Sequence, residues 1–408
     1  MTEPRECGIV SAMPRTVATQ RVGAWGDASD VLQLLLDRRS WTRAEIARTT
    51  SLSRSTIVLR LDALREAGLL RDAGQMSPEG GRPTSKVALN DAVVTVASIE
   101  IGHSAVHLAA ADLSAIAYAE ADLPIAQTDS FEQVLRGAVD RLRELIVDSD
   151  HGPLASVTLG LPLSAASSAV GLMAPGRQDG WASFPAREWL EDKLEVAVHV
   201  ENDVNLMALG ELNAAPDLRD VVLLHAGDGI GLGVICDGLL VRGSSGQAGE
   251  IAHVPALRRN DEPCICGNVG CVGAIATIPA LLRMLREEGC AADDFDDVQQ
   301  LIIRGDATAA RLLRQAGRDV GDVLVYALAT TNPQVLIIGG TMAVAGDFFV
   351  AGVKEALFTR GAPSVTEGLQ VLRSSLPPGS VTAGALRLSA EYVLTGTHLF
   401  DLLSASAA

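Results

Sequence analysis

Residues 221–235 read VVLLHAGDGIGLGVI, two apolar runs separated by a glycine-rich turn. A short apolar run bounded by turn residues is typical of a buried strand, so the stretch predicts two strands joined at GDGIG. Three glycines in a turn allow the backbone to approach a phosphate, yet Asp228 puts a carboxylate at the centre of this one. The stretch therefore predicts an α/β core and raises the question of whether the turn binds a nucleotide.

Strand-like and helical segments alternate through the chain after residue 90. Apolar runs such as VVTVASIEIG and SVTLGLPLS are separated by helical patterns, for example at residues 131–148. This alternation predicts an α/β body of two lobes, with ligands bound in the cleft between them. We expect a first lobe at residues 91–204 with a C-terminal helix at 388–408, and a second lobe at residues 205–387.

The N-terminal part has a different pattern. Residues 1–25 show no periodicity and are expected to be flexible, whereas residues 26–90 predict short helices and a hairpin. A capping box from Thr42 to Glu45 begins one helix, and Ser53 caps the next. Short helices around a tight turn, followed by a glycine-containing hairpin, predict a winged helix-turn-helix.

The recognition helix and the wing of this head carry groups suited to DNA. Hydroxyl and guanidinium groups at a helix start bind phosphates and guanine edges, and an arginine on a wing tip can enter a minor groove. The residues expected to contact DNA are Ser53, Arg54, Ser55, Thr56, Arg60 and Arg82. A small protein-docking domain would have the same helices, but the basic helix start and basic wing together favour DNA.

Charge is distributed unevenly along the chain, whose net charge is −17. Residues 1–90 hold 13 Arg/Lys and 10 Asp/Glu, whereas the remainder holds 20 and 40. Only the head is therefore suited to nucleic acid. The N-terminus lacks the apolar segment of a signal peptide, and prolines interrupt the uncharged residues 151–176, so we expect a cytoplasmic protein with no membrane partner.

The segment GEIAHVPALRRNDEPCICGNVGCVG, residues 249–273, brings one histidine and three cysteines into a short loop. Three thiolates and one imidazole suit the tetrahedral preference of Zn²⁺, and clustering of this kind in an intracellular protein favours a metal over disulfides. We predict a Zn²⁺ held by His253, Cys264, Cys266 and Cys271. Four protein ligands leave no open position, so this metal is expected to be structural.

A second polar motif, Glu201-Asn202-Asp203, lies between an apolar strand and a helix. Asn and Asp are preferred helix caps, which accounts for one of these residues without any ligand. A carboxylate at a helix N-terminus in a cleft stays ionised and can accept a hydrogen bond from a sugar hydroxyl. The two roles are compatible.

In order, the motifs ENDVN, GDGIG, GEIAH and CxCGxxGC over residues 93–400 resemble the ROK family (repressor, open reading frame, kinase), and the winged head resembles its repressor branch. The resemblance implies an actin-like (ribonuclease H-like) two-lobed fold, a sugar in the cleft, and a homodimer or dimer of dimers. It also implies sugar-hydroxyl contacts from Asn202, Asp203, Glu250 and His253. In the kinases of the family, the counterpart of Asp203 is the base.

Two departures from the family pattern concern phosphate. Where the kinases have D-x-G-G-T, this chain has Glu100 at the first position and His103 in place of a glycine. Their second loop, G-T-G-x-G, has Asp228 in place of the threonine. A carboxylate about 4 Å from a phosphate charge costs about 4 kcal/mol at an effective dielectric of about 20. The sequence therefore predicts that GDGIG no longer binds a nucleotide and that the protein is not an enzyme.

The sugar half is altered as well. The family's E-x-G-H reads E-I-A-H at residues 250–253, and a glutamate expected two positions after the last zinc cysteine is Gly273. One expected hydroxyl contact is therefore missing, which weakens the prediction of a simple hexose. The ligand could instead be a bulkier sugar, a phosphorylated sugar, or a molecule that is not a sugar.

From these observations we predict a DNA-binding transcriptional regulator, a repressor of carbohydrate metabolism, that binds a double-stranded operator and senses a sugar or sugar derivative. One alternative is an ATP-dependent sugar kinase with an appended DNA-binding head. Another is a regulator controlled by a second protein, with a vestigial cleft.

Overall fold

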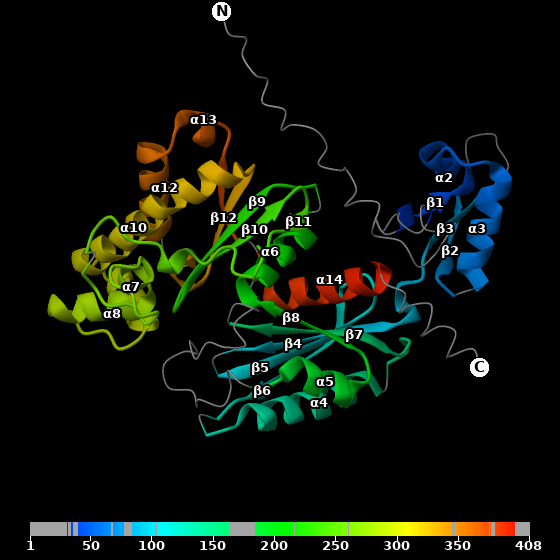
Figure 1. Cartoon of the computed structure of the whole chain (residues 1–408), viewed down its shortest axis with the longest axis horizontal. Coiled ribbons are helices and arrows are strands. Elements are labelled where there is room, and N and C mark those ends of the chain that lie inside the picture. Colours follow the sequence, from blue (N-terminus) through cyan, green and yellow to red (C-terminus); the bar gives the residue numbers. More distant parts are fainter. Residues whose placement is uncertain are drawn as a thin grey trace, which may run out of the picture. The chain divides into compact units, whose positions relative to one another are not determined.

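Figure 1 shows the chain as a computed structural model. The structure describes residues 31, 34–35, 40–66, 68–76, 84–102, 104–126, 128–147, 149–162, 184–215, 217–259, 261–344, 347–374, 376 and 380–395. The predictions made for residues 1–25, Arg82 and His103 concern residues outside these ranges. The chain divides into two units, one built mainly on residues up to Val94 and the other on Thr95–Asp150 and Ser156–Ser389.

The first unit contains a winged helix-turn-helix. Its helices and strands are β1 (Trp41–Thr42), α2 (Arg43–Thr50), α3 (Arg54–Glu66), β2 (Leu70–Met76) and β3 (Thr84–Leu89). The predicted capping box is present, since Thr42 Oγ1 accepts from the Glu45 amide and the Glu45 carboxylate accepts from the Thr42 amide at 2.7 Å. The strands form an antiparallel sheet in the order β1-β3-β2, and Ile57, Leu61 and Leu64 of α3 are buried.

The second unit contains two five-stranded sheets with the same strand order: third, second, first, fourth and fifth along the chain. In each sheet the first three strands pair antiparallel and the last two pair parallel. The first sheet has β6 (Ala117–Pro124), β5 (Ala105–Ala111), β4 (Thr95–Ile101), β7 (Leu154–Leu161) and β8 (Ala197–Asn202). The second has β11 (Leu239–Leu240), β10 (Ile230–Cys236), β9 (Val221–Ala226), β12 (Val335–Gly339) and β13 (Gln370–Arg373). One strand order repeated in two sheets is the two-lobed architecture that the sequence predicts.

Helices cover these sheets, with α4 and α5 on one face of the first sheet and α14 on the other (Figure 1). Within the described residues, no helix is long and apolar enough to cross a membrane. The helices are α4 (Phe131–Val147), α5 (Ala186–Leu194), α6 (Asp203–Ala214), α7 (Gly273–Ala276), α8 (Ile278–Glu287), α9 (Phe295–Ile303), α10 (Ala307–Thr331), α11 (Thr341–Val344), α12 (Phe348–Arg360), α13 (Pro363–Thr366) and α14 (Ser380–Thr395), with short 3₁₀ turns η2 (Asp91–Val93) and η3 (Ile251–His253).

Strand β9 is buried on both faces, as its continuous apolar run suggests. Val222 and Leu224 pack in one hydrophobic cluster with α8, α10 and α12, whereas Val221 and Leu223 pack in another with α6 and α14. Successive side chains of a strand point to opposite faces, so a strand between two helical layers needs an apolar residue at every position. The predicted strand-turn-strand at residues 221–235 is therefore confirmed.

The glycines of GDGIG differ in role. The Gly227 amide donates to the Gly229 carbonyl at 2.9 Å and closes the turn. Gly231, which the turn interpretation had included, lies inside β10, where a Cβ would lie 3.1 Å from the Val204 side chain of α6. At Gly233 a Cβ would approach a side chain of α6 to 2.5 Å. These two glycines allow α6 to pack closely on β10.

The last helix begins earlier than predicted. Helix α14 starts at Ser380, directly after the helix-breaking sequence Pro377-Pro378-Gly379, whereas a helix at 388–408 was expected. Residues 396–408 lie outside the described residues. The Ser389 hydroxyl donates to the Ala97 carbonyl at 3.2 Å and shares a 2.7 Å hydrogen bond with Thr158, which ties α14 to β4 and β7.

Candidate functional site

Strand β8 leads directly into the first turn of α6, where two of the predicted ligand-binding residues lie. Asn202 is the N-cap: its side-chain oxygen accepts from the amides of Val204 at 2.9 Å and Asn205 at 3.1 Å. Asp203 is the first residue of the helix, and its Oδ1 also accepts from the Val204 amide, at 2.7 Å. The predicted capping role is therefore filled by Asn202, and the Asp203 carboxylate stands at the helix N-terminus.

Glu201, the first residue of the same motif, is buried and has three hydrogen-bond partners. Its Oε1 accepts from the Asn205 side chain at 2.9 Å and from the Asn202 amide at 3.0 Å. Its Oε2 accepts from Arg242 Nε at 2.6 Å. Arg242 follows β11, so this ion pair joins the end of a strand in the first sheet to a loop of the second. Sequence reasoning missed Arg242, which lies 41 residues further along the chain.

The pKa of Asp203 is raised well above its ordinary value. Burial raises the pKa of Asp203 to about 7, the hydrogen bond from the Val204 amide opposes this, and the negative charges of Glu100 and Glu250 raise it further. Burial also raises the pKa of Glu100, whose carboxylate accepts from the Thr382 hydroxyl at 3.1 Å. Asp203 therefore changes charge near neutral pH, and the expectation that its place at a helix N-terminus keeps it ionised is wrong, because burial and the charges of Glu100 and Glu250 outweigh the helix dipole.

Glu250 is positioned by its neighbour Gly249. The Gly249 carbonyl accepts from the Leu232 amide of β10 at 2.9 Å, and Gly249 has a φ of 97°. A Cβ there would lie 2.0 Å from the Leu232 carbonyl oxygen, so only glycine fits. Glu250 leads straight into η3, whose last residue is His253. Two predicted ligand contacts are therefore carried by one short segment fixed to β10.

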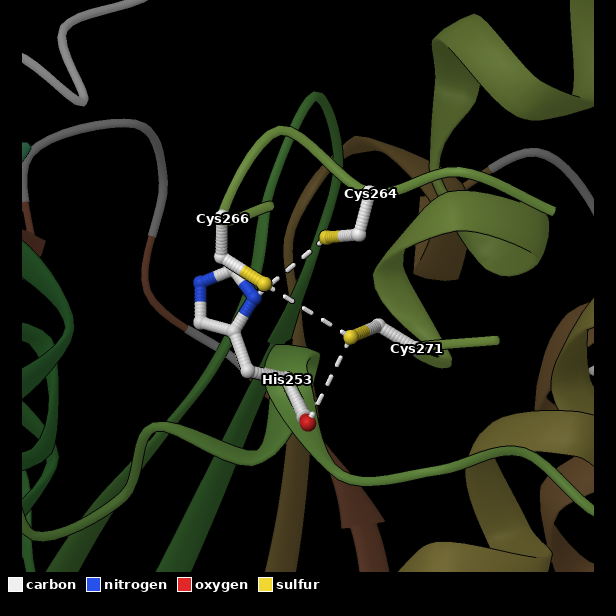
Figure 2. Close-up of side chains that lie close together, drawn as sticks. All are labelled: His253, Cys264, Cys266 and Cys271. Carbon is white, nitrogen blue, oxygen red and sulfur yellow. Dashed lines mark hydrogen bonds between the residues drawn. The ribbon is translucent and has the colours of Figure 1, made fainter. Parts of the chain in front are cut away.

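The structure brings the four predicted metal ligands together, with their side chains pointing toward one another (Figure 2). Their ligand atoms all lie within 4.8 Å of one another. The distance from His253 Nδ1 to Cys264 Sγ is 3.5 Å, and that from Cys266 Sγ to Cys271 Sγ is 3.8 Å. A tetrahedral ion with metal–sulfur bonds of about 2.3 Å and metal–nitrogen bonds of about 2.0–2.1 Å separates its ligands by about 3.6–3.8 Å. The closest pairs thus have the dimensions of a tetrahedral metal site.

His253 belongs to both groups of predicted residues. Its Nδ1 faces Cys264, so the second ring nitrogen, Nε2, lies on the other side of the imidazole (Figure 2). A histidine that ligates a metal through one nitrogen carries its proton on the other, which then donates a hydrogen bond. The geometry therefore allows His253 to bind a metal and a ligand hydroxyl at the same time.

Comparison with known proteins places the chain in a family. The sequence matches the ROK family over residues 96–391. The chain belongs to the ROK family. Similarity also extends past the ROK body into the head. The chain is 24% identical over 376 residues to the xylose repressor of Caldicellulosiruptor bescii, and the aligned region covers 88% of this chain and 94% of that protein. It is 26% identical over 383 residues to NagC of Escherichia coli K12, named a DNA-binding transcriptional dual regulator, which covers 89% and 91%.

A solved ROK structure has the same overall fold. The crystal structure of a ROK family transcriptional regulator described as a homolog of the E. coli MLC protein superimposes with a TM-score of 0.78. The superimposed region covers 93% of this chain and 99% of the chain in that crystal structure, at 19% sequence identity. The family, its repressor branch and the fold predicted from the sequence are confirmed.

The loop that carries the candidate metal ligands is fixed to α8 and α10 by ion pairs. Arg258, between His253 and the first cysteine, binds the buried Asp319 of α10 through two hydrogen bonds of 2.9 and 2.8 Å. Arg283 of α8 donates to the Glu262 carboxylate at 3.2 Å. These partners are distant in sequence, and nothing in the local pattern could have identified them. The loop conformation therefore rests on α8 and α10 as well as on its ligands.

Two departures from the ROK sugar motif meet in space. A Cβ on Gly273 would lie 3.1 Å from the Ala252 carbonyl oxygen and 3.2 Å from the Ala252 Cβ. Both distances are shorter than ordinary van der Waals contact, which for carbon is about 3.5–4.0 Å. A side chain at position 273 would therefore meet both the backbone oxygen and the methyl group of Ala252.

The turn at GDGIG, which the sequence relates to a phosphate loop, carries an exposed carboxylate. Asp228 is exposed in the turn between β9 and β10. Beneath the turn, burial lowers the pKa of His225, and the charge of Asp228 acts in the opposite direction. The exposed carboxylate of Asp228 would repel a phosphate bound at this turn.

The head presents some of its predicted DNA contacts to solvent and uses others internally. Arg54 and Ser55 at the start of α3 are exposed, whereas Arg60 is half-buried. The Ser53 hydroxyl accepts from the Thr56 amide at 3.1 Å, so Ser53 caps the helix as predicted. It also forms hydroxyl–hydroxyl hydrogen bonds with Ser55 at 2.9 Å and Thr56 at 2.7 Å.

Proposed function

We propose that this protein is a DNA-binding transcriptional regulator, a repressor of carbohydrate metabolism, whose ROK body binds a sugar or sugar derivative. The proposal is carried by one observation: a winged helix-turn-helix and a ROK body occur in one chain, over the extent that it shares with a xylose repressor and with NagC. A ROK body alone would leave the kinase function equally open.

The sugar is bound at the N-terminus of α6 by Asn202, Asp203, Glu250 and His253. Carboxylates accept hydrogen bonds from hydroxyl groups, and the helix dipole favours a negative charge at this position. The raised pKa of Asp203, about 7, means that bound hydroxyls can also meet a protonated carboxyl as donor. The Glu201–Arg242 ion pair ties the Glu201-Asn202-Asp203 motif to the loop that leads to Glu250.

The head, residues 26–90, binds the operator, with Ser53, Arg54, Ser55, Thr56, Arg60 and Arg82 as the contacting residues. Exposure of Arg54 and Ser55 supports a role for the first turn of α3 in the major groove. The protein acts as a homodimer or dimer of dimers on a pseudo-palindromic operator, with half-sites about 34–36 Å apart or a multiple of that.

The cluster of His253, Cys264, Cys266 and Cys271 holds a structural Zn²⁺. When bound, the ion neutralises thiolate charge and fixes the loop, and four protein ligands leave it no open position for catalysis. Because His253 would bind both the ion and the sugar, the ordered loop would also fix the position of one sugar contact. The ion pairs of Arg258 and Arg283 orient the loop from behind.

The cleft does not transfer phosphate. A triphosphate would face the exposed carboxylate of Asp228 and the acidic groups around Asp203, which supports loss of nucleotide binding. The second candidate function, an ATP-dependent sugar kinase, is favoured by one observation. The pKa of Asp203, about 7, is that of an effective general base at neutral pH.

A thermal-shift screen tests the proposal. The purified protein is heated with monosaccharides, amino sugars and sugar phosphates, and with MgATP alone and combined with each. Because a ligand that binds only the folded state stabilises it, we expect one class of sugar to raise the melting temperature and MgATP to have no effect. Stabilisation by MgATP would instead favour the kinase. No response to any sugar would favour control by another protein.

A further inference from the structure

Helix α3 exposes an apolar side chain on the surface that faces away from its own core. Leu59 is 72% exposed and Val58 is 38% exposed, whereas Ile57 and Leu61 are at most 1% exposed. Leu59 is two positions from each of these core residues, about 200° around the helix axis. Its side chain therefore points directly outward.

The neighbours of Leu59 on this surface are the residues already proposed to bind DNA. Residues four apart lie one turn apart on the same face, so Arg54 is next to Val58 and Ser55 is next to Leu59. One turn later the face ends at Asp62, which pairs with Arg65 at 3.2 Å. The exposed surface of the first two turns thus combines a guanidinium, a hydroxyl and two aliphatic side chains.

The major groove offers such a surface one apolar group, the 5-methyl of thymine, next to acceptors that suit arginine. We propose that Leu59 contacts a thymine methyl in the major groove, so that each operator half-site carries an A·T pair at that position. The inference rests on the proposed function, because it assigns a specificity-determining residue to the proposed DNA-binding helix. Val58, less exposed and nearer the core, borders the same contact.

The test uses the full chain and a library of randomised 30-base-pair duplexes. The duplexes that wild-type protein enriches are resynthesised with each thymine replaced in turn by deoxyuridine, which removes only the methyl group. Affinities are measured for wild type, for Leu59→Ala, and for the control Ile303→Ala. Ile303 lies in α9 of the body and is 75% exposed, so its replacement removes a comparable aliphatic surface away from the head.

We expect one thymine per half-site whose replacement weakens wild-type and Ile303→Ala binding about fourfold, the effect of one methyl-sized contact. Leu59→Ala should bind the thymine and deoxyuridine duplexes equally. Retention of the wild-type thymine preference by Leu59→Ala would overturn the inference, as would enrichment of a sequence at which no thymine methyl matters. If wild type enriches no sequence, the proposed function itself fails.

Discussion

Replacing Asp203 by Asn should stabilise the protein at alkaline pH. The pKa of Asp203 is raised from 3.8 to about 7, so the folded state holds the proton more tightly than the unfolded state does. The contribution of this group to stability is therefore fully present below about pH 4 and is lost as pH rises through about 7. At pH 8 the folded protein carries an ionised carboxylate that its surroundings disfavour.

The size of the pKa shift of Asp203 determines how much stability the Asp203→Asn variant gains. Each pKa unit corresponds to about 1.4 kcal/mol, so a shift of about three units gives a ceiling of about 4 kcal/mol. Asp203 is only partly enclosed, and solvent screening reduces this to about 2 kcal/mol. The asparagine oxygen can still accept from the Val204 amide, so the start of α6 is retained. For a body of this size the gain corresponds to about 4 °C in melting temperature.

Scanning calorimetry of wild type and Asp203→Asn from pH 4 to pH 8 at constant ionic strength measures this. The variant should melt about 4 °C higher at pH 8, and the difference should shrink steadily to nearly zero at about pH 4, where both the folded and the unfolded wild type hold the proton. Glu120→Gln, which removes an exposed carboxylate from β6, should change neither value. A difference between Asp203→Asn and wild type that does not vary with pH would refute the buried-carboxylate explanation.

Other substitutions test the remaining parts of the account. Cys266→Ser should release zinc, measured by elemental analysis, and lower the melting temperature, whereas Cys290→Ser should keep the metal. Arg54→Ala should weaken duplex binding and reduce its salt dependence by about one unit; an unchanged affinity and slope would contradict the recognition helix. Gly273→Ala should cost about 1–2 kcal/mol through contact with Ala252, and adding Ala252→Gly should recover part of it, so additive effects would refute the steric coupling.

Features determined by neighbours in sequence were predictable. The capping box at Thr42 depends on a residue three positions away, and the metal ligands all lie within one loop. The apolar run of β9 specifies a strand buried on both faces whatever the partners are. In each case the information lies within about twenty residues.

Contacts between residues that are far apart in the sequence were not predictable. The Glu201–Arg242 and Arg258–Asp319 ion pairs join residues 41 and 61 positions apart, and charged residues alone do not indicate their partners. The sequence alone places Gly231 in the turn, because its neighbours in the sequence are turn residues. Its reason is instead the close packing of α6 on β10, which only the tertiary structure reveals.

The central claim is that sugar binding in the ROK body controls DNA binding by the head. The most direct measurement compares the affinity of wild type and Asp203→Ala for an enriched duplex, with and without the sugar that stabilises the protein. We predict that the sugar changes the wild-type affinity at least about fivefold and leaves Asp203→Ala unchanged, while the two proteins bind equally without sugar. A stabilising sugar that leaves the wild-type affinity for DNA unchanged would contradict the account.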